Sequence, residues 1–348
     1  MKSMDTHLLS KILSNFNINE DATHLEKIST GYINDTYKLY ISEKPKYILQ
    51  KINTVVFKNV ENIFHNIDVI QSNKVDIGVK LITSKSKKLY TIINNKDYWR
   101  LMSYEPGSYT FNNSNKPTIA FECGKVLSEF HKNLNTLNIN NFKDIIPNFH
   151  NLPYRLKEFK SILKFANKEE IINCTNQINF VKKISSRFDS IYNNKLDLRL
   201  CHNDSKLNNI LFNKENKAIY LIDLDTIMPG LILYDFGDTV RTIVNPVPEE
   251  ETDLNKIKFN KKMILSFIDG FQKLFTNIDL NEKKLLPLSV ALMPFMHGLR
   301  ALSDHLNGNK YFKVTYVNQN LIRAKNLFKF SEIALENEIY MKKIIDKY

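Results

Sequence analysis

Glycine is scarce in this chain, and its glycines stand apart from one another. The 348 residues include nine glycines, and none of them has the Gly-x-Gly-x-x-Gly spacing that dinucleotide-binding folds and protein kinases place against phosphate groups. Cysteine is scarcer still, because Cys123, Cys174 and Cys201 are odd in number and widely spaced. This spacing shows no metal-ligand cluster, and we expect a reducing, cytoplasmic location.

The chain also lacks long apolar runs and blocks of like charge. Its best candidate for a membrane span, Leu285–Met296, is short and contains Pro287 and Pro294, whereas a spanning helix needs roughly 20 residues. The first ten residues have no apolar run and no cleavage site, so we expect no signal peptide. The formal charge is +12, but Lys and Arg are scattered, which favours a solvated basic surface over a nucleic-acid-binding site.

One segment carries the residue types of a phosphoryl-transfer site. His202, Asp204, Lys206 and Asn209 follow the pattern His-x-Asp-x-Lys-x-x-Asn. Phosphoryl transfer needs a carboxylate that holds the acceptor hydroxyl, and Asp204 suits this task as the catalytic base. Lys206 can reach the transferred phosphoryl group as a point charge, and His202 is expected to brace the loop. A lone Asp or Asn in a loop is usually a turn former, but the set together predicts catalysis.

A hairpin after this loop is expected to supply the magnesium ligands. Residues 209–213 and 218–222 have the pattern of two short strands joined by a polar turn. A symmetric hairpin centred on Asn216 places Asn209 directly opposite Asp223, with side chains about 5 Å apart. Amide and carboxylate oxygens are ligands that Mg²⁺ prefers. Asn209 and Asp223 are therefore the predicted metal ligands.

A further carboxylate, Asp235, lies in an Asp-Phe-Gly triplet, which binds metal in protein kinases. One hairpin accounts for the separation of Asp204 and Asp223, and Asp235 lies well beyond that hairpin. We therefore predict that Asp235 caps backbone N–H groups and fixes the catalytic loop instead of binding metal.

The N-terminal part of the chain has the make-up of a kinase N-lobe, a small sheet with a long helix. The segment Trp99–Gly107 changes from an apolar strand to a Pro-Gly stop, which suits a hinge, so we expect the adenine of ATP to bond the backbone of Ser103, Tyr104 and Glu105. The expected elements are helices at 5–16 and 58–73 and strands at 24–41, 46–53, 79–83 and 88–93.

The segment Ser29–Thr36 is the expected substitute for a glycine-rich phosphate loop. Gly31 permits a tight turn there, and backbone N–H groups can approach phosphate. The residues alone leave two interpretations open, contact of Gly31, Asn34 and Thr36 with the nucleotide or a plain hairpin turn; the family resemblance described below implies nucleotide contact.

A lysine that faces the ATP phosphates is expected on the strand that follows. Gln50 and Lys51 point to opposite faces of that strand. Kinase chemistry requires a lysine, with Glu61 on the next helix as its partner, and this selects Lys51. The alternative is an exposed Lys51 with Gln50 pointing inward.

The C-terminal part has helical periodicity, and the chain divides into an N-lobe at residues 1–103 and a C-lobe at 104–348. Arg300 ends a helix of buried character, so it needs a polar partner; with Tyr311 it is predicted to bind the acceptor, and a salt bridge to Asp304 is the alternative. The expected helices are at 118–134, 154–166, 177–192, 256–275, 284–305 and 319–346.

At these residues the chain resembles the aminoglycoside phosphotransferase and choline kinase superfamily and, within it, the N-acetylhexosamine 1-kinases. The likeness rests on the catalytic loop and on the segments 222–241, 30–37 and 303–308. It implies a bilobal α+β, protein-kinase-like fold that holds ATP between the lobes. It also implies transfer of the ATP γ-phosphate to the anomeric hydroxyl of N-acetylglucosamine or N-acetylgalactosamine, with Mg²⁺ as cofactor.

The resemblance assigns one further role, a sugar-hydroxyl contact, to Asp225. On a continuing strand Asp225 would point to the same face as Asp223, and the alternative is a solvated loop acid. The expected partners are ATP and a small-molecule sugar, with no nucleic acid and no membrane, and we expect a monomer.

Three other functions compete with the sugar 1-kinase. The first is a kinase for choline, methylthioribose, homoserine or an aminoglycoside, which shares the catalytic loop; cationic acceptors would require an acidic cleft. A protein kinase is disfavoured because no Ala-Pro-Glu signal follows Asp223. A non-enzymatic basic binding module leaves Asp204, Asn209 and Asp223 unexplained.

Overall fold

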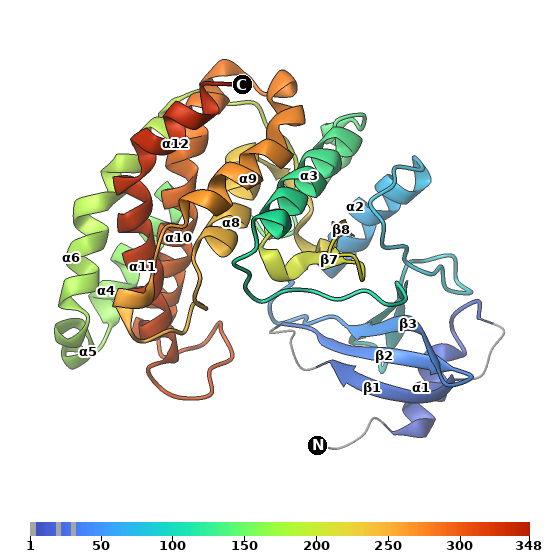
Figure 1. Ribbon diagram of the computed structural model, residues 1–348. Helices are drawn as coiled ribbons and strands as arrows, with labels where there is room; N and C mark the ends of the chain where they lie inside the picture. The colour runs from blue at the N-terminus through green and yellow to red at the C-terminus, as the bar shows by residue number, and fades with distance from the viewer. Residues whose placement is uncertain (1–4, 19–21, 29–32) are drawn as a thin grey trace. The chain divides into compact units, whose positions relative to one another are not determined.

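The computed structural model describes residues 5–18, 22–28 and 33–348 (Figure 1). The chain forms two compact units. Unit 1 comprises the residues up to Ser108 together with Asn140–Ile146, and unit 2 comprises Tyr109–Ile139 together with Pro147–Tyr348. The predicted α+β class is confirmed, because unit 1 is built on an antiparallel sheet and unit 2 is mainly helical. The predicted division into residues 1–103 and 104–348 stays a prediction.

Unit 1 contains a five-stranded antiparallel sheet in the order β1-β2-β3-β5-β4. The predicted strand at 79–83 is wrong, since Leu81 makes only an isolated bridge to Met102. The strands are β1 Ala22–Ile28, β2 Asp35–Ile41, β3 Lys44–Lys51, β4 Thr91–Ile93 and β5 Asp97–Ser103, and the helices are α1 Thr6–Leu13 and α2 Val60–Ser72.

Alternation along the strands divides this sheet into two faces. One face carries Leu39, Leu49 and Leu101, which pack against Ile12 of α1 and the following Phe16. Burial of each such side chain stabilises the unit by about 1.5–3 kcal/mol. We call this the α1 face. The side chains at alternate positions of β2, β3 and β5 lie on the opposite face.

Unit 2 is built around α10, which runs from Leu280 to Leu306 and packs against α4, α8 and α11 (Figure 1). Among the described residues this helix alone is long and apolar enough to cross a membrane, but 89% of its most apolar window is buried inside the protein. The apolar segment Leu285–Met296, which the sequence offered as a candidate membrane span, is thus the middle of a longer helix in the protein core. The other helices are α3 Pro117–Leu134, α4 Leu152–Phe165, α5 Lys168–Asn173, α6 Thr175–Ile184, α7 Asp189–Asn193, α8 Ile232–Val244, α9 Lys261–Phe271, α11 Gln319–Glu336 and α12 Glu338–Ile345.

The helices α8 and α10 approach each other unusually closely at Gly237. A Cβ atom at this position would lie 2.3 Å from the backbone oxygen of Ser289, so only glycine fits. This contact holds the first turns of α8 against the core helix. The sequence did not predict α8, although this helix supplies several of the polar groups described below.

Two short two-stranded sheets in unit 2 carry the predicted catalytic segment. In one, β6 (Arg199–Cys201) pairs with β9 (Met228–Gly230), and in the other β7 (Ile210–Phe212) pairs with β8 (Ala218–Leu221). The catalytic loop begins where β6 ends, and the hairpin β7–β8 follows it. A single turn of 3₁₀ helix, η3 (Leu207–Asn209), connects the two.

Candidate active site

The catalytic loop is held at its base by Asp235 in the first turn of α8. One carboxylate oxygen accepts the backbone N–H of His202 at 2.7 Å, and the other accepts that of Asn203 at 2.7 Å. Asp235 is completely buried, so both charge-assisted bonds form away from water, where they are strongest. These are the contacts that a loop-bracing role requires.

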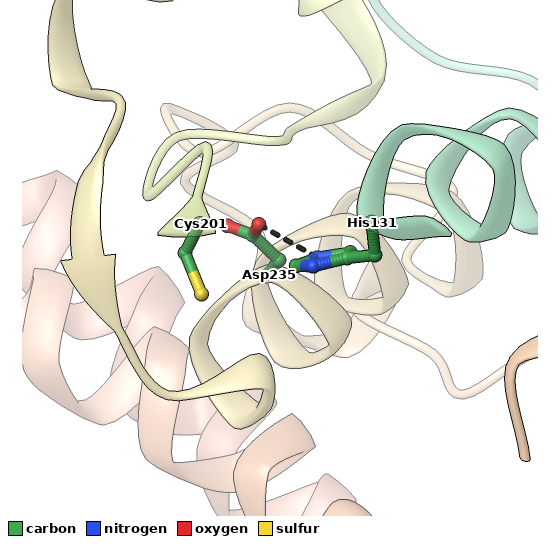
Figure 2. A group of neighbouring side chains, drawn as sticks. All are labelled: His131, Cys201 and Asp235. Carbon is green, nitrogen blue, oxygen red and sulfur yellow. Dashed lines mark ion pairs between the residues drawn. The ribbon is translucent and has the colours of Figure 1, made fainter. Parts of the chain in front are cut away.

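Asp235 also lies between His131 and Cys201 (Figure 2), and its Oδ2 is 3.0 Å from Nε2 of His131. These three residue types can bind metal. Burial, with Asp235 nearby, raises the pKa of the Cys201 thiol well above its ordinary range, and both Asp235 oxygens already accept backbone N–H groups. Because Asp235 holds the backbone of His202 and Asn203, the group is a structural brace of the loop.

A second group of metal-binding residue types, Glu170, Cys174 and His305, lies away from the loop. His305 Nε2 and Glu170 Oε2 are 3.0 Å apart. Burial raises the pKa of Cys174 to about 11, so this thiol also stays protonated at neutral pH. Neither group was visible in the sequence, because each joins residues from separate helices or strands.

Further hydrogen bonds fix the rest of the loop. Asn203 donates to the backbone oxygens of Thr226 and Met228 at 3.0 and 3.2 Å, and Thr226 Oγ1 donates to the oxygen of His202 at 2.7 Å. Ser205 Oγ donates to the backbone oxygen of Asp235 at 2.9 Å. The loop conformation is thus determined by side chains from its own residues and from the segment before α8.

His202 links the catalytic loop to the end of the hairpin. Its Nδ1 accepts the N–H of Asp204 at 3.3 Å, and its Nε2 donates to the backbone oxygen of Ile222 at 2.9 Å. Ile222 directly precedes Asp223, so the ring connects the two carboxylates that the sequence singled out. The imidazole has the position expected of a brace.

Asp204, Lys206 and Asn209 form one connected group. Lys206 Nζ donates to Asp204 Oδ2 at 2.8 Å, and Asn209 Nδ2 donates to the backbone oxygen and to Oδ2 of Asp204 at 2.8 and 3.0 Å. Burial opposes the charged form of Lys206, but Asp204, followed by Asp223 and Asp238, raises its pKa. Lys206 therefore stays positively charged among three carboxylates at neutral pH.

The hairpin is present, but the predicted pairing of Asn209 with Asp223 is wrong. Ile210 pairs with Leu221, and the oxygen of Asn209 accepts the N–H of Ile222 at 2.8 Å, so the register is shifted by one residue. Asp223 follows the ladder in the left-handed conformation, with φ 63°. A regular strand does not contain this conformation. The exposed Asp223 therefore does not lie directly opposite Asn209, as the symmetric hairpin predicted.

Asp225 is not on a continuing strand, so the alternation that linked it to Asp223 is wrong. It lies in a turn of 3₁₀ helix, η4 (Leu224–Thr226). The alternative of a solvated acid is also wrong, because Asp225 is 2% exposed. A buried carboxylate beside the catalytic loop is compatible with a contact to acceptor hydroxyls, which stays a prediction.

Sequence reasoning missed a buried charge network around Asp238 on α8. Asp238 Oδ1 accepts from Arg241 Nε at 2.7 Å and from His297 Nε2 at 3.0 Å. Arg241 also bonds Glu249, which accepts from Arg323 Nε at 2.6 Å. Burial would raise the pKa of Asp238, but Arg241 and His297 lower it well below its usual range. The i, i+3 spacing of Asp238 and Arg241 would have indicated this pair had α8 been predicted.

Arg300 lies among aromatic rings in the C-terminal part of α10. Its guanidinium is 4.8 Å from the ring centre of Phe149 and 5.9 Å from that of Phe312, and it donates to the Tyr311 hydroxyl at 3.3 Å. The alternative of a salt bridge to Asp304 is wrong, since Asp304 accepts the backbone N–H groups of Tyr311 and Phe312 at 2.8 and 2.9 Å.

The charge of Arg300 interacts with the candidate base. Burial lowers the pKa of Arg300, Tyr311 and Asp204 raise it, and the cations Arg155 and Arg323 lower it further. Three arginines therefore surround this region, and Asp204 is near enough to Arg300 for their charges to interact.

The predicted nucleotide-binding residues lie in unit 1. Gly31 falls outside the described residues. Asn34 Oδ1 accepts the backbone N–H of Asn53 at 2.9 Å, and Thr36 Oγ1 accepts from Gln50 Nε2 at 2.8 Å. The structure thus shows both described side chains fixing the start of β2 and its neighbours.

The predicted pairing of Lys51 with Glu61 is wrong. Lys51 Nζ bonds Asp97 Oδ1 at 2.8 Å, whereas Glu61 accepts from the Tyr90 hydroxyl at 3.2 Å. Lys51 lies on the α1 face because it alternates with Gln50, which is buried on the opposite face. Of the alternative considered for this strand, the inward Gln50 is observed, whereas Lys51 is half-buried and paired instead of exposed.

At the predicted hinge two backbone N–H groups already have partners. Ser103 donates to the oxygen of Lys80 at 2.9 Å, and Tyr104 donates to that of Lys46 at 3.2 Å. Any contact of these two residues with adenine would therefore use their carbonyl oxygens. The contact of Glu105 with adenine stays a prediction.

The predicted metal ligands have suitable chemistry for Mg²⁺. Because Asn209 Nδ2 bonds Asp204, the amide orientation leaves its oxygen as the ligand atom. Asp223 acts electrostatically on Lys206, so its carboxylate belongs to the same group. Mg²⁺ prefers oxygen ligands such as an amide oxygen and a carboxylate. It takes a few of them from the protein and the rest from water and phosphate.

Comparison with known proteins gives one family and a consistent fold. The family model described as "Phosphotransferase enzyme family" matches residues 24–255. A solved aminoglycoside phosphotransferase from Alicyclobacillus acidocaldarius is 11% identical, covers 97% of this chain and 96% of that chain, and has a TM-score of 0.62.

Two further solved structures have the same fold. An amicoumacin kinase in complex with AMP-PNP, Ca²⁺ and Ami is 12% identical, with coverage of 94% and 93% and a TM-score of 0.62. A choline kinase from Streptococcus pneumoniae is 13% identical, with coverage of 94% and 99% and a TM-score of 0.58. The predicted protein-kinase-like fold is confirmed.

Proposed function

The chain belongs to the phosphotransferase enzyme family, and we propose that it transfers the γ-phosphoryl group of ATP to the anomeric hydroxyl of N-acetylglucosamine or N-acetylgalactosamine. The observation that carries the proposal is the connected group of Asp204, Lys206 and Asn209. It combines a carboxylate, a cation and an oriented amide within hydrogen-bonding distance, as phosphoryl transfer requires.

In the proposed reaction Asp204 accepts the proton of the acceptor hydroxyl. The acceptor oxygen then forms a bond to the γ-phosphorus, the bond from that phosphorus to the β,γ-bridging oxygen breaks, and ADP leaves. Lys206 stabilises negative charge on the transferred group, because its raised pKa keeps it charged. Asn209 and Asp223 would hold a magnesium ion, which neutralises phosphate oxygens when bound.

Arg300 supports a neutral acceptor over a cationic one. Within the described residues its side chain bonds the hydroxyl of Tyr311 and no carboxylate, and its charge interacts with Asp204. A cationic acceptor at Asp204 would be repelled by this guanidinium, whereas a sugar hydroxyl or an N-acetyl carbonyl oxygen can accept a hydrogen bond from it. We assign Arg300, Tyr311 and Asp225 to the acceptor.

The alternative acceptor classes remain those that share the catalytic loop: choline, methylthioribose, homoserine and aminoglycosides. The structural relatives include enzymes named for choline and for aminoglycosides, which are cations. The charge at Arg300 disfavours that class for this chain. Methylthioribose is uncharged, and homoserine carries a carboxylate beside its ammonium group, so neither is a net cation. These two are the stronger competitors of the N-acetylhexosamines.

The proposal extends to the setting of the enzyme. We propose that it acts as a monomer on small molecules, without nucleic acid or membrane, and that it works in the cytoplasm. The three cysteines are buried and free, which suits a reducing compartment.

The acceptor is tested by ³¹P NMR of ATP and Mg²⁺ with a panel of N-acetylhexosamines, other sugars, amino alcohols and aminoglycosides. We expect a new phosphomonoester signal, coupled to an anomeric proton, with an N-acetylhexosamine. Turnover of another class, with none of any N-acetylhexosamine, would overturn the proposed acceptor and leave the family assignment intact.

A further inference from the structure

The segment 303–308, which carries part of the family likeness, ends α10 and begins the loop that leads to α11 (Figure 1). Gly308 and Asn309 both have left-handed backbone conformations, with φ 83° and 56°. The N–H of Asn309 donates to the backbone oxygen of Asp304 at 2.7 Å. A glycine reaches this conformation without strain, as is common just after a helix. The chain therefore turns back sharply at the end of α10.

The carboxylate of Asp304 binds the backbone of this loop. Its Oδ1 accepts the N–H of Tyr311 at 2.8 Å, and its Oδ2 accepts that of Phe312 at 2.9 Å. Oδ2 also accepts from Asn320 Nδ2 of α11 at 3.0 Å. Asp304 is buried, so these bonds form away from water, where they are strongest. Asp235 binds two consecutive N–H groups of the catalytic loop in the same way.

The two residues that Asp304 binds form part of an aromatic cage around Arg300, which lies one turn earlier on α10. The guanidinium is 5.6 Å from the ring centre of Tyr311 and 5.9 Å from that of Phe312. Phe149 completes the cage at 4.8 Å. The rings of Tyr311 and Phe312 are almost perpendicular, at 82°. These contacts give the Arg300 side chain a defined direction.

The guanidinium of Arg300 still has donors for a ligand. In the part of the chain that the structure describes, only the Tyr311 hydroxyl accepts a hydrogen bond from it, whereas a guanidinium carries five N–H donors. The side chain is half-buried. Arg300 is therefore held mainly by ring contacts, and most of its N–H groups remain available.

We propose that Asp304 is a positioning residue for the acceptor: by binding the backbone of Tyr311 and Phe312, it closes the cage that orders Arg300. The inference rests on the proposed function, in which Arg300 contacts the acceptor. A side chain that is ordered beforehand loses little freedom when the ligand binds, so the affinity for the acceptor is higher. Both oxygens of Asp304 bond the loop backbone, so Asp304 acts through Arg300 and does not touch the acceptor.

The test separates acceptor affinity from ATP affinity and from turnover. In Asp304→Asn the amide oxygen can accept one loop N–H, and the amide N–H₂ faces the other. We expect the KM of the acceptor to rise about 10-fold, as for the loss of one ordered long side chain. The kcat and the KM of ATP should stay within about 2-fold. Amide hydrogen exchange should be faster at Tyr311 and Phe312.

A double-mutant cycle shows whether Asp304 acts through Arg300. In an Arg300→Met background, Asp304→Asn should raise the KM of the acceptor by less than about 2-fold, because the side chain that it orders is gone. An aspartate with a merely structural role would raise this KM equally in both backgrounds.

Phe312→Leu provides a second variant if Asp304→Asn fails to fold, which thermal unfolding of each variant reports. It removes one ring of the cage and leaves Asp304 in place, so it should raise the KM of the acceptor in the same direction. The matched control is Asp279, an exposed carboxylate at the opposite end of α10 that accepts the N–H of Asn281 at 2.6 Å. Asp279→Asn keeps a capping side chain and should leave every kinetic constant within about 2-fold.

A normal acceptor KM in folded Asp304→Asn would overturn the inference, and so would a normal KM in Phe312→Leu if Asp304→Asn does not fold. An equal rise in the Arg300→Met background, or a parallel rise in the KM of ATP, would also overturn it. Turnover of another acceptor class alone would overturn only the proposed N-acetylhexosamine, and the same variants would then be measured with that acceptor. No turnover of any acceptor would overturn the proposed function and this inference together.

Discussion

Lys206 donates a hydrogen bond to Asp204 at 2.8 Å, so the cation and the proposed base form an ion pair with one residue between them. The two side chains are 26% and 21% exposed, which leaves both accessible to a ligand. In the proposed reaction this pair would place a positive charge where the transferred phosphoryl group meets the acceptor oxygen.

Replacement of this cation should slow the chemical step. We expect Lys206→Met to lower kcat by about 10²-fold, the effect of removing one electrostatic group from a transition state, with little change in the melting temperature. Lys206→Arg should retain more activity because it keeps the charge. A kcat within about 3-fold of wild type in Lys206→Met, measured by a coupled ADP assay, would exclude this role.

Loss of the buried carboxylate at Asp235 should destabilise unit 2. In Asp235→Asn one amide oxygen can accept one of the two backbone N–H groups, and the amide N–H₂ faces the other. We expect a loss of about 2–3 kcal/mol in the free energy of unfolding, from the unsatisfied group and the lost charge. Urea unfolding measures it.

The exposed cap Asp253, which accepts the N–H of Asn255 at 3.1 Å, provides the matched control for Asp235. Asp253→Asn keeps a capping side chain and should cost less than about 0.5 kcal/mol. Equal costs for the two substitutions would show that Asp235 does not brace the loop.

Arg300 should set the acceptor affinity without affecting ATP. Arg300→Lys keeps the charge but loses the planar group that lies over Phe149, so we expect the KM of the acceptor to rise at least about 10-fold and the KM of ATP to stay within about 2-fold. Arg187, an exposed arginine paired with Glu338, gives the control Arg187→Lys. Parallel changes in both KM values would place Arg300 outside the acceptor site.

His150 should make the protein sensitive to acid. It is buried, and its Nε2 donates to the backbone oxygen of Asn203 at 2.8 Å. Burial, with the neighbouring His297, lowers the pKa of His150 to about 3, while an unfolded histidine has a pKa near 6.5. Arg300 lowers the pKa further, and Asp238 opposes the shift.

The sign of this effect follows from the lowered pKa. Between the two pKa values the unfolded state binds one more proton, so the stability from His150 is complete above about pH 6.5 and is lost as the pH falls toward 3. Between these pKa values the contribution of His150 to the free energy of unfolding changes by about 1.4 kcal/mol per pH unit. We expect His150→Gln to remove this contribution to the pH dependence of the free energy of unfolding, measured by urea unfolding at pH 7, 6, 5 and 4. The same pH dependence in the variant and the wild type would show that His150 is not the source of the acid sensitivity.

The sequence predicted the fold class and the order of most elements because both depend on local periodicity. The strand pattern at 46–53 and the apolar spacing of α3 were sufficient for those two elements, whereas β1 and β2 were expected within one segment at 24–41 and β5 only as the start of the hinge segment Trp99–Gly107. Helix α8 was missed although its polar residues Asp235, Asp238 and Arg241 recur at helical spacing, because the segment was interpreted through its Asp-Phe-Gly triplet.

Groups of candidate site residues could be predicted from the sequence where the residues are close in the chain. Their positions could not be predicted where a residue between them has an unusual backbone conformation. The loop from His202 to Asn209 was singled out from its residue types, their spacing and the hairpin that follows, and its catalytic role stays a prediction. The left-handed conformation of Asp223 was not, because a non-glycine residue rarely adopts it, and this one turn shifted both Asp223 and Asp225 from their expected places. Contacts between distant segments, such as Asp238 with His297 or Lys51 with Asp97, leave no local pattern.

The central claim is that Asp204 is the base of a phosphotransferase, and the kcat of Asp204→Asn with the best acceptor tests it most directly. The substitution keeps the size of the side chain and an oxygen that can accept the bond from Lys206. We predict a kcat at least about 10²-fold below wild type, with adenine nucleotide binding retained. Turnover at the wild-type rate would contradict the assignment of Asp204 as the base.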